Sequence, residues 1–465
     1  MTIIFSIASP VVFRNLFFFP KSVYARMREI MPHRPDLSVV FVLPEAHRHK
    51  YPEFLRECRE AGFAVEFVSA PLAEGLLQRL FYFFYSYLVY TGTTRIMATI
   101  GTRPDEPPAG GRWYLAPLKR LIASAFGRFR FVKRSVIPRL YLIFFRNRPF
   151  RDIFVRYRPE LVFAPHLYGW FDAVLLAEAR RSGVKTMGMA AGWDHLDKYF
   201  LPFRVDKLLA QSDQVKQGAI RFQGYLPEEI ALVGYPHFDF VLSGEYVMTR
   251  AQVLGRLGFP PTAKLLLYVS GSAYCPDEPD IIETILSWAD EGKFGSDVYL
   301  VIRPYSGGRS KDKEIEEKKF GRFAGHPRVA IFRRDFWGDL EKSIYFVNIL
   351  RHADAVVALY TTMVLEAAAL DRPLIAPAFD GYHSRPFHRS IRRFEQFEHF
   401  GEVMRIGAMR TARNFADLFR YLDEYLKNPQ LDAEKRELLR RRLYYKLDGK
   451  ASERILSHLF SSHES

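Results

Sequence analysis

Two threonines and a glutamate in the second half of the chain have the types and spacing of an anion-binding site. Thr361 and Thr362 follow an apolar run (residues 355–359) that predicts a buried strand, and Glu366 falls in the first turn of the helix predicted next. Backbone N–H groups and hydroxyls at the start of a helix bind diphosphates, and a carboxylate one turn further in can accept from both ribose hydroxyls. The same residues are as typical of a helix cap followed by a solvated acid, so both interpretations stay open.

The elements that must position these residues alternate between strand and helix. Apolar, often β-branched runs predict strands that are buried on both faces, as in parallel sheets, and strand–helix alternation at this spacing indicates βαβ units. The predicted strands cover residues 3–8, 38–43, 64–68, 161–164, 185–189, 207–210 and 230–233 in the first half, and residues 264–270, 298–302, 329–332, 355–359 and 373–376 in the second. We therefore expect an α/β protein of two doubly wound, Rossmann-like domains and a helical tail.

The length of 465 residues suits several domains with ample cores. We place a first domain at residues 1–240 with an aromatic and basic insertion at 76–151, and a more polar linker at 241–258. A second domain follows at 259–445, with a terminal helix at 446–465. Two cysteines, Cys58 and Cys275, exclude a disulfide framework or a cysteine-rich zinc site.

The net charge of +15 and the 15% of aromatic residues are unusual. Both are concentrated in the insertion, where residues 112–151 hold eleven basic residues and no acid, so the rest of the chain carries only +4. A basic amphipathic segment rich in aromatics is typical of an interfacial helix on anionic lipid. The alternative is that the aromatics fill the first domain's core and the arginines form its wet face. Nucleic acid is disfavoured because no helix-turn-helix, zinc module or RNA-binding signature is present.

Neither a signal peptide nor a membrane span is expected. The apolar N-terminus has no basic residue before Arg14, and the aromatic run at 80–94 falls short of the ~20 residues that cross a bilayer. We expect a cytoplasmic protein that associates peripherally with the inner face of the cell membrane.

Several short motifs, in this order, resemble the GT-B glycosyltransferase superfamily. The stretch 349–381 resembles its nucleotide-binding half, where strand, Ser/Thr pair, helix, Glu-Ala and Pro form the donor-site signature. Residues 208–239 resemble the segment that leads to a Gly-x-Pro-x-Phe-Asp turn. Residues 448–455 are similar to the terminal helix of the CDP-glycerol glycerophosphotransferase-like branch, and residues 192–198 resemble a loop of surface-polysaccharide transferases.

The resemblance implies a GT-B fold whose two domains face a cleft, with the donor on the second domain. The donor-binding residues would be Ser270, Gly271 and Ser272 after the first strand, Arg303 at the end of the next strand, and Thr361, Thr362 and Glu366. Gly271 would let the backbone approach the phosphates, and Arg303 could bind a phosphate through two N–H groups. A surface arginine at a strand end is the alternative for Arg303. Cofactors and bound metal are not expected, because no metal-ligand cluster is evident.

An inverting enzyme of this kind needs a general base from the first domain. Candidates at the carboxyl ends of predicted strands, where ligands bind in open α/β sheets, are His166, Asp172, Asp194 and His195. We favour Asp194 or His195, which fall in the loop that carries the resemblance, with His166 in reserve. The sequence does not distinguish inverting from retaining chemistry.

A second basic island follows the donor signature. Residues 381–394 include Arg385 and Arg389 and contain no acid. In the superfamily this loop faces the cleft and can hold the diphosphate or an anionic acceptor. Simple solvent exposure is the alternative.

These features predict a glycosyltransferase that moves a sugar from a nucleotide-sugar to a membrane-associated, lipid-linked glycan in cell-surface polysaccharide synthesis. One alternative is a CDP-polyol-phosphate transferase, which is disfavoured because Pro304-Tyr305 stand where such relatives have His-Pro. The others are a nucleotide-sugar 2-epimerase and a non-catalytic GT-B scaffold.

Overall fold

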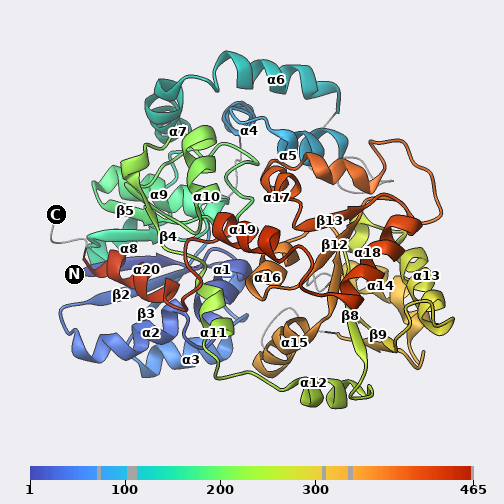
Figure 1. Cartoon of the computed structure of the whole chain (residues 1–465). Helices are drawn as coiled ribbons and strands as arrows, with labels where there is room; N and C mark the ends of the chain where they lie inside the picture. The colour runs from blue at the N-terminus through green and yellow to red at the C-terminus, as the bar shows by residue number, and fades with distance from the viewer. Residues whose placement is uncertain (71–74, 102–112, 306–309, 334–338, 462–465) are drawn as a thin grey trace. The chain divides into compact units, whose positions relative to one another are not determined.

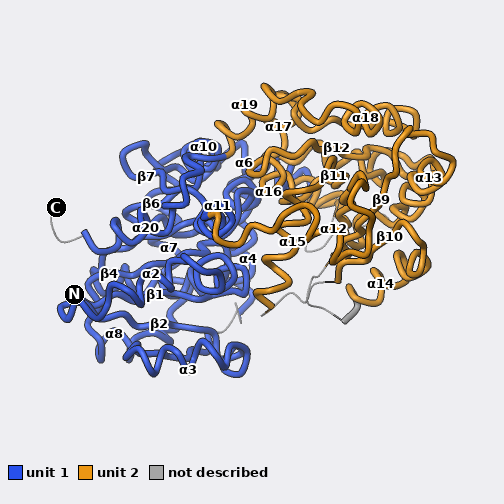
Figure 2. The backbone as a smooth tube through the Cα atoms, turned by 60° about the horizontal axis from the view of Figure 1, so that its bottom comes forward, with its two compact units in different colours: residues 1–94, 116–243, 444–465 blue, residues 95–115, 244–443 orange. Residues whose placement is uncertain are grey.

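The computed structural model describes residues 1–70, 75–101, 113–305, 310–333 and 339–461. The chain forms two compact units (Figure 2): unit 1 comprises residues 1–94, 116–243 and 444–465, and unit 2 comprises residues 95–115 and 244–443. Arg112, the first residue of the basic stretch, lies outside the described residues.

Unit 1 is built on a seven-stranded parallel sheet with the order β3-β2-β1-β4-β5-β6-β7. Its strands are β1 (Thr2–Ser6), β2 (Ser38–Pro44), β3 (Ala64–Val68), β4 (Leu161–Ala164), β5 (Lys185–Gly188), β6 (Lys207–Ala210) and β7 (Ile230–Leu232). β4 is buried from end to end and β1 is buried after its first residue, as their apolar runs require when helices cover both faces. The order reverses between β1 and β4, which is where open α/β sheets bind ligands.

Unit 2 has a six-stranded parallel sheet with the order β10-β9-β8-β11-β12-β13. Its strands are β8 (Lys264–Val269), β9 (Val298–Arg303), β10 (Val329–Ile331), β11 (Ala355–Ala358), β12 (Leu374–Pro377) and β13 (Met409–Ala412). The pattern analysis did not include β13, whose sequence, Met-Arg-Thr-Ala, is short and half polar. The predicted fold class, two parallel α/β sheets of Rossmann type, is confirmed.

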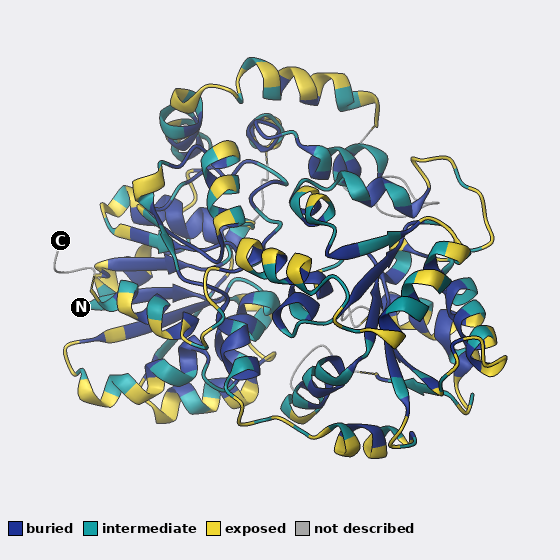
Figure 3. Ribbon diagram, in the orientation of Figure 1, coloured by how far each residue is buried: buried dark blue, intermediate teal, exposed yellow. Residues whose placement is uncertain are grey.

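Helices cover both faces of each sheet (Figure 1), and the buried strands lie between them (Figure 3). The α-helices are α1 (Pro10–Phe13), α2 (Val23–Ile30), α3 (Pro52–Glu60), α4 (Leu76–Ser86), α5 (Gly92–Arg95), α6 (Ala116–Ala125), α7 (Ile137–Phe144), α8 (Arg151–Tyr157), α9 (Trp170–Ser182), α10 (Asp213–Gly218), α11 (Asp239–Leu242), α12 (Arg250–Leu257), α13 (Glu278–Asp290), α14 (Ser310–Phe320), α15 (Leu340–His352), α16 (Met363–Ala369), α17 (Gly401–Ile406), α18 (Phe415–Lys427), α19 (Ala433–Leu443) and α20 (Ala451–Phe460). No helix among the described residues has both the length and the apolar character that crossing a bilayer requires.

The C-terminal helix α20 belongs to unit 1, where a carboxylate side chain caps its N-terminus. Asp239, which is buried, accepts hydrogen bonds from the backbone N–H groups of Ala451 (3.0 Å) and Ser452 (2.7 Å) at the start of this helix. Gly234 has φ +91°, and a Cβ there would lie 3.2 Å from the Ala451 Cβ and the Arg454 guanidinium. The Gly-x-Pro-x-Phe-Asp turn therefore contacts the tail motif directly, and its aspartate caps the helix that the tail motif begins.

Candidate functional site

The loop after β4 presents His166 at the carboxyl edge of the unit 1 sheet. Asp172, fully buried in the first turn of α9, accepts from the backbone N–H groups of His166 (3.1 Å) and Leu167 (3.0 Å) and from the Ser6 hydroxyl (2.5 Å). Leu167 adopts a left-handed conformation, φ +54°, which the loop imposes on a residue that disfavours it. Both oxygens of Asp172 are thus engaged in shaping the loop, which makes Asp172 a structural residue here.

The loop after β5 carries Asp194 and His195 and is tied down from several directions. Asn15 donates to the Ala191 carbonyl (3.2 Å), and Gln223 donates to the carbonyls of Leu196 (2.8 Å) and Tyr199 (2.9 Å). Because buried amides hold its backbone on both sides, the loop holds its side chains in a fixed arrangement.

Three threonines of the insertion provide further support for this loop. Thr91 donates to the Asp197 carbonyl (2.6 Å), Thr93 to the Asp197 carboxylate (3.0 Å) and Thr94 to the Lys198 carbonyl (2.6 Å). The sequence analysis treated residues 80–94 only as an aromatic run. The spacing of hydroxyls within it was the one local signal of a second role.

The three predicted catalytic residues come together at this edge. The His166 and His195 ring centroids lie 5.7 Å apart with the rings nearly perpendicular, and the Tyr168 ring lies 4.9 Å from that of His195. The Asp194 carboxylate lies 3.9 Å from His195 Nε2 and 2.5 Å from Lys198 Nζ. Two imidazoles, a carboxylate and an ammonium group therefore share one small region.

Two glycines make this close approach feasible. A Cβ at Gly192 would lie 2.8 Å from Asp194 Oδ1 and 3.2 Å from His195 Nε2, and a Cβ at Gly169 would lie 2.9 Å from His166 Nδ1. Any larger residue would displace the side chains of this cluster.

The candidate proton acceptors His166 and Asp194 differ in their surroundings. Burial lowers the pKa of His166 below its usual value, and the Lys198 ammonium acts in the same direction, against the attraction of Asp172. The Asp194 carboxylate forms an ion pair with Lys198. The cluster can accept a proton from a hydroxyl group placed beside it.

In unit 2, the loop after β8 rests on a buried charge network. Ser270 donates to Glu278 (3.0 Å), Gly271 N–H donates to the other Glu278 oxygen (2.8 Å), and Ser272 N–H donates to the Ser270 hydroxyl (3.0 Å). Lys319 Nζ donates to the Ser272 carbonyl (2.9 Å), to Glu278 and to Glu316 (3.1 Å). The groups that the sequence analysis assigned to the donor phosphates thus have internal partners.

The network also reaches the end of the next strand. Glu316 accepts from the backbone N–H of Tyr305 (2.6 Å), two residues after Arg303, and the Arg303 carbonyl accepts from Ser270 N–H (3.0 Å). Burial raises the pKa of Glu278, and Lys319 opposes that rise. Burial lowers the pKa of Lys319, but Glu278 and Glu316 outweigh it, so the net shift is upward and Lys319 stays charged. We call Glu278, Glu316 and Lys319 the buried triad.

Arg303, Thr361, Thr362 and Glu366 lie at the same carboxyl edge of the unit 2 sheet, because β9, β8 and β11 are parallel neighbours. A Cβ at Gly271 would lie 2.6 Å from the Leu359 side chain, so the loops after β8 and β11 are in direct contact. Arg303 places its guanidinium over the Phe346 ring at 4.9 Å. Thr361 Oγ1 accepts from Met363 N–H (3.3 Å), and Glu366 is half-buried in the first turn of α16.

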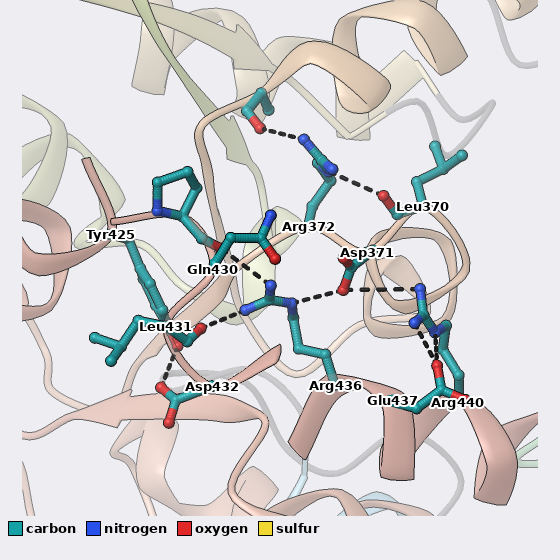
Figure 4. Close-up of polar contacts among 12 residues, drawn as sticks. Leu370, Asp371, Arg372, Tyr425, Gln430, Leu431, Asp432, Arg436, Glu437 and Arg440 are labelled. Carbon is teal, nitrogen blue, oxygen red and sulfur yellow. Dashed lines mark hydrogen bonds and ion pairs between the residues drawn. The ribbon is translucent and has the colours of Figure 1, made fainter. Parts of the chain in front are cut away.

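The far end of α16 is anchored by a buried arginine (Figure 4). Arg436 of α19, 2% exposed, donates to Asp371 Oδ1 (2.8 Å) and to the carbonyls of Leu431 (2.5 Å) and Pro429 (3.0 Å). Asp371 follows α16 directly and has φ +56°. This contact anchors the C-terminal end of α16, the helix that carries Glu366.

The basic island divides into inward and outward groups. Arg385 pairs with both carboxylate oxygens of Asp277, and buried Arg393 donates to the carbonyls of Ser390 (2.6 Å) and Gly101 (3.2 Å). Arg389 is exposed. Asp277, Asp280 and His383 bring one ligand atom each within 4.8 Å of the others, a spacing that suits a cation. Because Arg385 already balances the Asp277 charge, we assign no metal to these three residues.

Comparisons with known proteins identify the fold. No protein-family model and no curated protein sequence matches the chain. Solved structures do match: a putative UDP-N-acetylglucosamine 2-epimerase from Listeria monocytogenes (13% identity, TM-score 0.52, covering 100% of this chain and 96% of the other), a UDP-GlcNAc 2-epimerase from Neisseria meningitidis bound to UDP-GlcNAc (10%, 0.51, 99% and 100%) and a glycosyltransferase from Rickettsia africae (9%, 0.50, 99% and 97%). The fold is therefore of GT-B type, as the sequence resemblance implied; the more specific glycerophosphotransferase-like branch is not confirmed.

Proposed function

We propose that this protein is a nucleotide-sugar-dependent glycosyltransferase. The observation that carries the proposal is the gathering of His166, Asp194 and His195 around Tyr168 at the carboxyl edge of the first sheet of a GT-B fold. Such an edge is where α/β sheets bind their ligands, and these side chains are the proton acceptors that glycosyl transfer uses.

His195 is our choice of general base. The Asp194 carboxylate is already engaged in an ion pair with Lys198, and burial lowers the pKa of His166, which makes His166 a weaker proton acceptor. In an inverting transfer, the acceptor oxygen would bond to the anomeric carbon as the bond to the diphosphate breaks. The hydroxyl proton would pass to His195 and the nucleoside diphosphate would leave.

The donor would lie on unit 2. Arg303 would bind a phosphate, Thr361 and Thr362 would present hydroxyls to the diphosphate, and Glu366 would accept from the ribose. The loop 270–272 would contribute its shape, held by the buried triad, and the exposed Arg389 would attract the anionic substrate. Cationic side chains can stabilise the leaving diphosphate, so the proposal needs no divalent metal.

The acceptor would be a membrane-associated, lipid-linked glycan of cell-surface polysaccharide synthesis. The exposed apolar and basic side chains of unit 1 support this part of the proposal. They also favour a transferase over a 2-epimerase, because an epimerase acts on the nucleotide-sugar alone and needs no membrane surface.

Acceptor-dependent turnover tests the proposal. Purified protein would be incubated with UDP-, GDP-, CMP- and CDP-linked sugars and with CDP-glycerol, with and without a membrane extract as acceptor. We expect nucleotide release from one nucleotide-sugar only when the extract is present, and loss of release in His195→Ala. Conversion of a nucleotide-sugar without acceptor would identify an epimerase, turnover of CDP-glycerol alone a polyol-phosphate transferase, and no turnover of any donor a scaffold.

A further inference from the structure

Exposed apolar side chains of unit 1 are concentrated in one stretch of the chain. Among the described residues of unit 1, ten of the twelve exposed large apolar side chains lie between residues 76 and 143: Leu76, Leu77, Leu80, Tyr82, Leu118, Leu121, Phe126, Phe129, Phe131 and Ile143. We call these ten residues the α4–α6 surface. Single exposed apolar residues are ordinary on a protein, but ten of them on one set of neighbouring helices are typical of a binding surface.

The helices that carry this surface are amphipathic with their outer faces apolar. In α4, Phe81 and Tyr85 are buried, whereas Leu76 and Leu77 are 73% and 67% exposed. In α6, Lys119 and Ile122 face inward, whereas Leu118 and Leu121 are 45% and 60% exposed. On a helix at the surface of a globular protein, leucines normally face the core and lysines face the solvent. α6 exposes two leucines and buries a lysine, which is the reverse arrangement.

Specific contacts hold these helices together as one layer. The rings of Phe84 and Phe126 lie 5.3 Å apart, which joins α4 to the end of α6, and the Phe81 ring stacks on Phe144 of α7 at 4.8 Å. Gln78 donates to the Phe144 carbonyl (3.0 Å). Figure 1 shows α4, α6 and α7 together along one edge of unit 1, and Figure 3 shows many exposed residues on α6.

The charge around the surface has one sign. Residues 75–94 and 116–151 of unit 1 hold eleven basic side chains and no acidic one. Four of them secure the layer to the rest of the unit: Lys119 lies over the Tyr87 ring, Lys133 donates to the Phe222 carbonyl, Arg134 pairs with Glu229 and Arg148 pairs with Glu178.

The other seven basic side chains, Arg79, Arg120, Arg128, Arg130, Arg139, Arg146 and Arg151, are exposed, and none forms an ion pair with a carboxylate of the described residues. Apolar side chains and outward cations on one layer complement the anionic interface of a phospholipid bilayer, where leucine and phenylalanine insert and arginine meets phosphate.

We propose that the α4–α6 surface docks unit 1 onto the anionic face of a membrane, with the apolar side chains of α4, α6 and residues 126–131 inserted into the interface. The proposal deepens the proposed function, on which it rests for its biological purpose, by naming the surface that brings the enzyme to a lipid-linked acceptor. Docking through interfacial side chains of this kind is shallow and reversible.

Vesicle co-sedimentation of the full chain tests this docking. The probes are phosphatidylcholine vesicles with and without phosphatidylglycerol, at low and high salt. We expect binding to the phosphatidylglycerol vesicles only, weakened by salt because the cations contribute through screened charge. Leu118→Glu with Leu121→Glu, and separately Leu77→Glu with Leu80→Glu, should each weaken binding at least ~10-fold.

Matched controls identify the surface. Val155→Glu, at an exposed valine of α8, and Arg56→Gln, at an exposed arginine of α3, should bind as the original chain does. Arg128→Gln with Arg130→Gln should weaken binding and reduce its salt dependence. Circular dichroism and the melting temperature verify folding, and having two independent leucine pairs keeps the test valid if one variant fails to fold.

Four outcomes would overturn the proposal: no vesicle binding, equal binding to neutral vesicles, equal loss in the controls, or a dimer in solution that the leucine variants dissociate. The last result would assign the surface to a second copy of the chain. Nucleotide-sugar turnover with a soluble acceptor, measured in parallel, separates the two proposals. Vesicle binding without turnover would support docking alone, and turnover without vesicle binding would support the transferase alone.

Discussion

The two sheets of this protein build their carboxyl edges in different ways. In unit 2, the loops after β8 and β9 rest on a buried ammonium group between two carboxylates, and their backbone N–H groups are engaged by that network. In unit 1, the loops after β4 and β5 are held by amides and hydroxyls, and their imidazole and phenol side chains pack against one another. The first edge suits rigid binding of a charged ligand, and the second suits proton transfer.

The comparison makes its largest prediction for activity. If unit 1 supplies the base, His195→Ala should lower turnover by about 10²- to 10⁴-fold, the usual contribution of a general base, and leave donor binding intact. Stopped-flow or discontinuous assay of nucleotide release would measure this. His399→Ala, at a histidine of unit 2, is the control and should retain turnover.

The buried triad should dominate the stability of unit 2. Lys319→Met leaves Glu278 and Glu316 without their counter-charge in a buried site, which costs about 3–5 kcal/mol of the free energy of unfolding. Urea denaturation monitored by circular dichroism would measure it. The exposed neighbour on the same helix, Lys318→Met, should change the free energy by less than about 0.5 kcal/mol. Equal effects of the two variants would contradict the role of the triad.

The corresponding change in unit 1 should be smaller. Asp172→Ala removes the acceptor of three hydrogen bonds at the loop after β4, which we expect to cost about 2–3 kcal/mol because water can reach part of that loop. Asp152→Ala, at an exposed acid of α8, is the control. A loss in Asp172→Ala that exceeds the loss in Lys319→Met would reverse the contrast between the two edges.

The smallest effect concerns acid. The folded chain holds His166 neutral at pH values where the unfolded chain would protonate it, since burial lowers its folded pKa below about 6.5. The unfolded state then binds more protons, so the free energy of unfolding falls as the pH drops from about 6.5 toward the folded pKa. His166→Gln should reduce this loss, whereas a variant with an unchanged acid profile would show that His166 titrates as in solution.

The sequence was sufficient for the fold and for the location of the candidate groups. Continuous apolar runs predicted the central strands. Parallel pairing then placed His166 and Asp194 at the carboxyl edge of the first sheet, and Arg303 and Thr361 at the carboxyl edge of the second sheet. The helical structure between residues 14 and 30 is interrupted, because Pro20 lacks an N–H group and Lys21 adopts φ +60°, and the separate helix α2 begins at Val23. The segment expected as a linker contains α12, which begins with a capping box formed by Thr249 and Gln252.

The buried contacts that hold the site loops in place could not be predicted from the local sequence pattern. Lys319 lies in a helix rich in charged residues, and its burial depends on contacts with Ser270 and Glu278, which lie 49 and 41 residues away in the chain. Arg134 and Arg148 belong to a stretch for which the sequence predicts an interfacial segment or, as the alternative, a wet basic face, yet their partners Glu229 and Glu178 lie 95 and 30 residues further along the chain. Whether a charged side chain is buried in an ion pair depends on a partner that is distant in the sequence, and neither composition nor hydrophobic periodicity predicts that partner.

The central claim is that unit 2 binds the nucleotide-sugar and unit 1 supplies the base. The most direct measurement is the melting temperature with a panel of nucleoside diphosphates, for the original chain, Arg303→Ala and His195→Ala. Ligand at a hundredfold excess over Kd stabilises the native state by about 2.7 kcal/mol. We predict that one nucleotide raises the melting temperature of the original chain and of His195→Ala by a few degrees, and leaves Arg303→Ala unchanged. A shift that persists in Arg303→Ala and disappears in His195→Ala would contradict this division of roles.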